Sequence, residues 1–164
     1  MFWYPDKRFS RITRVDIRRD LLDCGLRCVL LDIDNTILTR DTREIPEDVR
    51  TWLADARVAG IKLCLLSNNW HETPFRVAEE LELPLIAKAM KPLPGGFARA
   101  RRMLGATRAE TAIIGDQLST DIFGAHVARV KGYLVQPLVE QDLAHTVVIR
   151  KIENKIIRNC PLDD

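Results

Sequence analysis

The stretch RCVLLDIDNTILT, residues 27–39, decides the fold. It begins with a nearly continuous apolar run, which is typical of a strand buried on both faces of a parallel sheet. Two carboxylates, Asp32 and Asp34, follow at once, and because strand side chains alternate we expect both to point to the same side. A turn in which Asp and Asn bond to their own backbone would explain this motif equally well.

Further short apolar runs alternate with helical patterns along the chain. The runs lie at residues 61–67, 85–87, 111–115 and 132–136. Between them we predict one helix that starts near Pro46 and stops at Gly60, a second with Thr73 as its N-cap and Pro74 at its first position, and a third from Pro94 to Leu104. This alternation predicts an α/β fold, a doubly wound three-layer sandwich whose mainly parallel sheet is covered on both faces.

Composition limits the class of protein. The chain has 164 residues, 46% of them hydrophobic, which predicts one soluble globular domain over residues 1–164. None of its apolar stretches approaches the roughly 20 residues needed to cross a bilayer, and the first residues do not resemble a signal peptide. The four cysteines include no CxxC pair, so we expect reduced thiols and a cytoplasmic protein.

The net charge is only +2, but both ends of the chain are basic. Residues 1–19 hold six basic and two acidic side chains, and residues 145–158, predicted as an amphipathic helix, hold four basic and one acidic. With an acidic centre between them, these ends favour peripheral contact with an anionic membrane over a nucleic-acid partner. Packing within the protein stays open as an alternative: Ile149, Ile152 and Ile156 could contact the domain or a second copy, and the aromatic residues 2–4 could cover the sheet edge.

Polar residues follow the other predicted strands. Asp116 and Asp121 come after the run 111–115, and clustered carboxylates are stable around a hard cation. Ser67, with Asn68 behind it, ends the second run, and Lys91 lies just past the short third one. A hydroxyl, backbone amides and an ammonium suit a phosphoryl group. Because ligands of parallel sheets bind beyond the carboxyl ends of the strands, we expect the site at this edge.

The order of these motifs along the chain indicates a family. Asp-x-Asp-x-Thr, Ser, Lys-Pro and Gly-Asp-x-x-x-Thr-Asp, each after a strand and together spanning Asp32 to Asp121, resemble the haloacid dehalogenase-like (HAD) superfamily of aspartate-based phosphotransferases. The resemblance implies a Rossmann-like fold and a Mg²⁺-dependent phosphomonoester hydrolase. By this resemblance, Asp32 is the nucleophile that forms an aspartyl-phosphate, and Asp34 is the general acid and base.

The resemblance also implies the binding residues. Ser67 and Asn68 would bind the phosphoryl oxygens, and Lys91 would steady both the nucleophile and the phosphate. Mg²⁺ would be held by Asp32, Asp116 and the backbone carbonyl of Asp34. Thr36 and Asp121 are expected to support the site, Asp121 either on the metal side or by orienting Lys91.

The spacing of the motifs leaves no room for a cap domain. Only 30 residues separate Thr36 from Ser67, and one helix and one strand fill the interval from Lys91 to Asp116. A HAD member without a cap is expected to accept large or surface-bound substrates, or to use a neighbouring subunit of a homo-oligomer as its lid. The site should therefore be open.

The motif strings suggest a branch within the superfamily. LLDIDNTILT, LLSNN, KAMKPLPGGF and IIGDQLSTDIFGA look like subclass IIIA, and within it the phosphatidylglycerophosphate phosphatase-like branch. This implies a lipid-linked phosphorylated substrate, namely phosphatidylglycerophosphate. The alternatives are a soluble nucleotide or sugar phosphatase and a non-catalytic binding module of the same fold.

Overall fold

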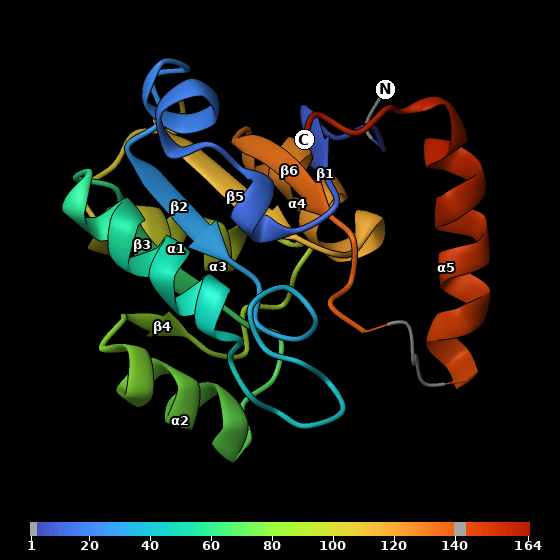
Figure 1. Ribbon diagram of the computed structural model, residues 1–164, viewed down its shortest axis with the longest axis horizontal. Helices are drawn as coiled ribbons and strands as arrows, with labels where there is room; N and C mark the ends of the chain where they lie inside the picture. The colour runs from blue at the N-terminus through green and yellow to red at the C-terminus, as the bar shows by residue number, and fades with distance from the viewer. Residues whose placement is uncertain (1–2, 140–143) are drawn as a thin grey trace.

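A six-stranded parallel sheet forms the centre of the computed structural model, which describes residues 3–139 and 144–164 (Figure 1). The strands are β1 (Lys7–Phe9), β2 (Cys28–Leu31), β3 (Lys62–Leu66), β4 (Leu85–Ile86), β5 (Thr111–Gly115) and β6 (Lys131–Val135). They are arranged in the order β1-β6-β5-β2-β3-β4, and every neighbouring pair is parallel. The predicted parallel sheet is thus confirmed.

Five α-helices are present among the described residues. They are α1 (Glu47–Val58), α2 (Glu72–Leu81), α3 (Pro94–Met103), α4 (Phe123–Ala128) and α5 (Ala144–Ile156). The prediction for the start of α2 was wrong: His71, not Thr73, is the N-cap, and Pro74 occupies the third helical position. Proline is tolerated there because the N–H groups of a first helical turn have no partner within the helix.

Two layers of helix cover the sheet, as predicted. Alternate residues of β2 face opposite sides: Val29 and Leu31 belong to a core shared with α1 and α2, whereas Cys28 and Leu30 pack with Phe97 of α3 and with α4. Figure 1 shows α1 in front of the strands and α3 and α4 behind them. Cys28, like the other cysteines of the chain, is a free thiol, and its side chain is buried.

The N-terminal segment contributes a strand that sequence analysis did not predict. β1 pairs with β6 at the sheet edge, and Lys7 Nζ donates to the buried Asp20 Oδ1 at 2.6 Å. The ring of Trp3 stacks on Phe123 with a centroid separation of 4.8 Å. Trp3 therefore packs against α4, and covering of the sheet edge by the N-terminal aromatics stays a prediction; Phe2 lies outside the described residues.

The C-terminal helix turns a charged face toward the rest of the protein. Arg150 donates to Asp116, Glu153 is buried, and Ile157 in the following 3-10 turn packs against Leu118. The predicted isoleucine stripe is divided: Ile156 packs, partly buried, against the same cluster, whereas Ile152 is 59% exposed. The side chain of Ile149 lies outside the described part of the chain.

No cap domain is present between the motifs in the described ranges 3–139 and 144–164. The segment from Thr36 to Ser67 holds only a loop, α1 and β3, and the segment from Lys91 to Asp116 holds only α3 and β5. Across those same ranges, no helix combines the length and the apolar character that a membrane crossing requires. The carboxyl ends of the strands are therefore left uncovered by any inserted domain.

The end of β5 leaves no space for a side chain, which gives a test of the fold. A Cβ added to Gly115 would overlap the carboxylate of Asp121, which is held in place by Lys91 Nζ and the Gln117 N–H. We expect Gly115→Ala to lower the free energy of unfolding by about 1–3 kcal/mol in urea denaturation. Gly95→Ala in α3 meets open space and is the control, expected to cause no loss. Equal stability of the two variants would contradict this close approach.

Candidate active site

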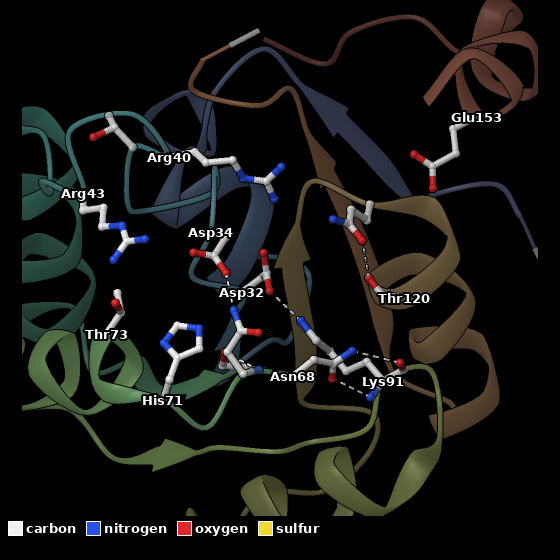
Figure 2. A pocket seen from close by; sticks show the side chains of 14 residues that line it. Asp32, Asp34, Arg40, Arg43, Asn68, His71, Thr73, Lys91, Thr120 and Glu153 are labelled. Atoms are coloured by element: carbon white, nitrogen blue, oxygen red, sulfur yellow. Dashed lines mark hydrogen bonds and ion pairs between the residues drawn. The ribbon is translucent and has the colours of Figure 1, made fainter. Parts of the chain in front are cut away.

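The predicted site residues meet at the carboxyl edge of the sheet. β2 lies between β3 and β5, so the strand ends that lead into Asp32, Ser67 and Asp116 are neighbours. A cavity of about 600 Å³ opens there. Five of the predicted residues line it: Asp32, Asp34, Ser67, Asn68 and Lys91. Figure 2 shows these groups converging from separate loops.

Lys91 joins two of the acidic residues. Its Nζ lies 2.6 Å from Asp32 Oδ1 and 2.7 Å from Asp121 Oδ1, and its side chain is only 2% exposed. Burial alone would lower the pKa of Lys91, but the negative charges of Asp121 and Asp32 outweigh burial and raise it. Lys91 is therefore a fixed positive charge directly beside the predicted nucleophile.

Three carboxylates gather around this charge. Asp32, Asp116 and Asp121 each offer an oxygen within 4.8 Å of the others. Burial, followed by the charges of Asp32 and Asp121, raises the pKa of Asp116 well above its usual value. Burial also raises the pKa of Asp121 to about 6, against the opposing effect of Lys91. Such a cluster needs more positive charge than Lys91 supplies.

The contacts of Asp116 indicate which kind of positive charge the cluster would bind. Its Oδ2 accepts a hydrogen bond from Arg150 at 2.5 Å, but its buried Oδ1 has no hydrogen-bond partner among the described residues. A buried carboxylate oxygen without a donor, close to two further carboxylates, suits a hard divalent cation. The residues present thus fit the metal that the motif order implies.

Asp34 has the properties of an acid–base group. Its Oδ2 accepts a hydrogen bond from Asn69 Nδ2 at 2.8 Å, which fixes its position at the cavity. Burial and then the charge of Asp32 raise the pKa of Asp34. A carboxylic acid with a raised pKa holds its proton closer to neutral pH, as proton transfer requires. Thr36 is fully buried, and its Oγ1 lies 3.4 Å from Asp32 Oδ2, which is a long contact.

The two residues at the end of β3 differ in what they contact. Ser67 Oγ accepts the backbone N–H of Asn69 at 3.1 Å while lining the cavity. The Asn68 side chain instead pairs with the backbone of Lys91: Nδ2 donates to the carbonyl at 3.0 Å, and Oδ1 accepts the N–H at 2.7 Å. Asn68 therefore positions the Lys91 loop, and any phosphate contact from it would have to use its backbone N–H.

Several residues of the site were missed by sequence reasoning. Arg40 and Arg43, from the loop before α1, line the cavity, as does Glu153 from α5. Glu153 Oε1 accepts the backbone N–H of Ser119 at 3.0 Å. Arg150 was expected only as part of a basic amphipathic helix, yet its side chain is 14% exposed and contacts Asp116. No local pattern marks Arg150 and Glu153, because the residues that they contact are distant in the sequence.

Comparisons with known proteins agree with this geometry. The model of the haloacid dehalogenase-like hydrolase family matches residues 6–129. The chain is 29% identical over 156 residues to the probable phosphatase YqeG of Bacillus subtilis, which covers 95% of this chain and 90% of that protein.

Solved structures with the same fold are more distant in sequence. The cobalt-bound deoxy-D-mannose-octulosonate 8-phosphate phosphatase YrbI of Haemophilus influenzae superposes with a TM-score of 0.55 at 13% identity, covering 82% of this chain and 88% of that one. A Legionella pneumophila protein described as a HAD subfamily III A hydrolase superposes with a TM-score of 0.53 at 14% identity, covering 81% and 76%. At these identities the likeness shows the fold alone.

The buried Lys91 charge can be tested by measuring stability. Lys91→Met leaves Asp32 and Asp121 facing each other without compensation, so we expect it to lower the free energy of unfolding by about 3–5 kcal/mol in metal-free buffer. Combining it with Asp121→Asn should recover part of this loss, because one of the two repelling charges is removed.

The control is a surface ion pair of similar length. Lys131 Nζ lies 2.8 Å from Asp6 Oδ1 with 58% of its side chain exposed, so Lys131→Met should cost less than about 1 kcal/mol. Urea unfolding of the three variants gives the comparison. Similar losses for Lys91→Met and Lys131→Met would show that Lys91 is not the charge on which the cluster depends.

Proposed function

The chain belongs to the haloacid dehalogenase-like hydrolase family, and we propose that it is a Mg²⁺-dependent phosphomonoesterase that works through an aspartyl-phosphate on Asp32. The class of enzyme, a phosphatase, agrees with that family and with the relative YqeG. The observation that carries the proposal is the cluster of Asp32, Asp116 and Asp121 around Lys91, with Asp34 beside it.

The first step transfers the phosphoryl group to the protein. A carboxylate oxygen of Asp32 attacks phosphorus, the bond from phosphorus to the leaving oxygen breaks, and its electron pair stays on that oxygen. Asp34 donates the proton that the leaving oxygen takes up, which its raised pKa favours. Lys91 reduces the repulsion between the Asp32 carboxylate and the phosphate dianion, and the Ser67 hydroxyl is in place to bind a phosphoryl oxygen.

The second step frees the nucleophile. Water attacks phosphorus, Asp34 takes the water's proton, and the bond between phosphorus and the Asp32 oxygen breaks, so that phosphate leaves and the carboxylate is restored. Asp32, Asp116 and the Asp34 carbonyl are the ligands proposed for Mg²⁺, which would supply charge compensation for the phosphoryl oxygens. Asp121 orients Lys91 through their 2.7 Å ion pair.

We propose phosphatidylglycerophosphate as the substrate. Support comes from the motif strings and from a cavity that no cap domain covers within the described ranges. The face of α5 that points away from the site adds to it: Val148 and Ile152 are 60% and 59% exposed and lie beside the exposed Lys151 and Lys155. Apolar and basic groups together on one helix face suit an anionic headgroup layer.

A soluble nucleotide or sugar phosphatase is the competing proposal for the substrate. Phosphate release from phosphatidylglycerophosphate in mixed micelles, compared with a panel of water-soluble phosphomonoesters, separates the two. A non-catalytic binding module is less well supported, because Asp32, Asp34, Ser67, Lys91 and Asp116 are all present at one sheet edge.

The nucleophile can be tested with a generic aryl phosphate. We expect Asp32→Asn to reduce Mg²⁺-dependent phosphate release by about 1,000-fold or more, and chelation of the metal to stop release by the unaltered protein. Asp55→Asn, an exposed change on α1, should leave activity unchanged and serves as the control. Circular dichroism would establish that each variant is folded. Substantial activity in Asp32→Asn would exclude Asp32 as the nucleophile.

The second step has a separate test. Because Asp34 activates the water, Asp34→Asn should retain transfer to Asp32 from an activated aryl phosphate but slow the breakdown of the product. The phosphorylated peptide should then accumulate and be detected by mass spectrometry after rapid quenching. Phosphate on a peptide that lacks Asp32 would contradict the mechanism.

Membrane recruitment is tested by sedimentation with vesicles. We expect the protein to sediment with phosphatidylglycerol vesicles at low salt but not with phosphatidylcholine vesicles. Lys151→Gln and Lys155→Gln should each weaken binding about fivefold, whereas Arg102→Gln on α3 should not. If the protein fails to sediment with anionic vesicles at low salt, α5 is not a membrane contact.

A further inference from the structure

A second group of positive charges lines the cavity away from Lys91. Arg40 and Arg43 belong to the loop between the Asp34 motif and α1, and in Figure 2 Arg43 lies on the side of Asp34 opposite to Lys91, whereas Arg40 lies above Asp32 and Asp34. His71 and Thr73, at the start of α2, line the same part of the cavity. Both arginines are distinct from Lys91, whose ammonium is paired with Asp32 and Asp121.

The loop that carries the arginines has a defined structure. Thr39 and Glu44 close it: the Thr39 N–H donates to the Glu44 carbonyl at 2.9 Å, and the Glu44 N–H donates to Thr39 Oγ1 at 3.2 Å. From α2, Arg76 donates to the backbone carbonyl of Arg43 at 2.9 Å. The loop is thus tied to itself and to α2, which fixes the backbone from which both arginine side chains reach the cavity.

The two arginines differ in their exposure to solvent. Arg40 is half-buried, and its charge acts on Asp34, whose pKa it lowers against the stronger effect of burial. Arg43 is exposed at the cavity, and Figure 2 shows no ion pair between its guanidinium and a carboxylate of the residues that line it. The α2 N-terminus next to them adds the partial positive charge of a helix of ten residues.

We propose that Arg43, beside His71 and Thr73 at the start of α2, forms a second anion-binding subsite, which selects phosphomonoesters that carry another negatively charged group beyond the phosphate that is cleaved. The inference deepens the proposed function and rests on it, because the position of the second anion is defined relative to the phosphate that is cleaved at Asp32. Guanidinium groups bind phosphate and carboxylate oxygens in a bidentate manner, so a phosphodiester or a carboxylate fits.

This subsite explains how a protein without a cap could select its substrate. A lipid-linked glycerol phosphate carries a phosphodiester one glycerol unit away from its terminal phosphate, and a sugar bisphosphate carries two phosphates at a similar separation. Both present two anions to one cavity of about 600 Å³. Their shared chemistry, two anionic groups on a short polar spacer, is what the subsite would recognise.

Binding of two non-hydrolysable phosphonates tests the subsite. Calorimetry with the full chain and Mg²⁺ would compare propylphosphonate with propane-1,3-bisphosphonate. Two equivalent ends alone would make the bisphosphonate bind about twofold more tightly than propylphosphonate. We expect a preference of at least about 10-fold in addition to that factor. Arg43→Gln should remove most of this preference while leaving the affinity for propylphosphonate unchanged. A purely structural role of Arg43 would change both affinities.

Arg99→Gln is the matched control, since Arg99 is exposed on α3. It should keep the preference of the unaltered protein. Displacement of the bisphosphonate by a short-chain phosphatidylglycerophosphate would assign the second anion to a lipid phosphodiester, and displacement by a sugar bisphosphate would assign it to a soluble ligand. Equal affinity for the two phosphonates, an unchanged preference in Arg43→Gln, or displacement by neither ligand would overturn the proposal.

This outcome is independent of the phosphatase assignment. The phosphonates are not cleaved, so their affinities are measured whether or not the protein turns over a substrate. Failure of the proposed function would appear instead as the absence of metal-dependent phosphate release from the aryl phosphate.

Discussion

Lys91 brings its ammonium group to within 2.7 Å of both Asp32 and Asp121, in a place where its side chain is almost fully buried, and the rest of the site is arranged around that charge. A buried ammonium is stable only where carboxylates surround it, and buried carboxylates are stable only beside cations. The strand order satisfies both conditions because β2 and β5 are neighbours. With Asp116 added, three acids face the two charges of Lys91 and Arg150, and the remaining excess is what makes this edge suitable for a metal ion and a phosphoryl group.

The same imbalance accounts for the position of α5. Asp116 is buried at the end of β5, and Arg150, 34 residues later in the chain, reaches it from α5. Glu153, one turn further on, accepts the N–H of Ser119 in the segment that follows the same strand. These contacts connect the C-terminal helix to the residues that would hold the metal. The inward face of α5 is therefore set by charge at the site, which leaves Val148 and Ile152 on the outward face.

An element could be predicted where the residues that form it are close together in the sequence, and could not where they are far apart. β2, β3 and β5 could be predicted because strands buried on both faces require continuous apolar runs, and Asp32, Ser67 and Asp116 could be predicted because they follow those runs. β1 could not, since a three-residue edge strand with two basic residues has no distinguishing pattern. Arg150 and Glu153 were missed because only the folded chain brings them to Asp116 and Ser119. The start of α2 was misplaced because His71 makes no side-chain cap that a sequence pattern would reveal.

Selectivity in an uncovered site has to come from the elements that form its rim. Here the rim consists of the loop that carries Arg40 and Arg43, the start of α2 with His71, and Glu153 of α5. The loop follows Asp34 closely in the chain and is bonded to α2, so the groups that would contact the outer part of a substrate are joined directly to the acid–base residue. A substrate with a second anion would meet positive charge on both sides of Asp34, from Lys91 on one side and from Arg43 on the other. Its alignment would then be set by two attachment points, which places the leaving oxygen near Asp34 without an inserted domain.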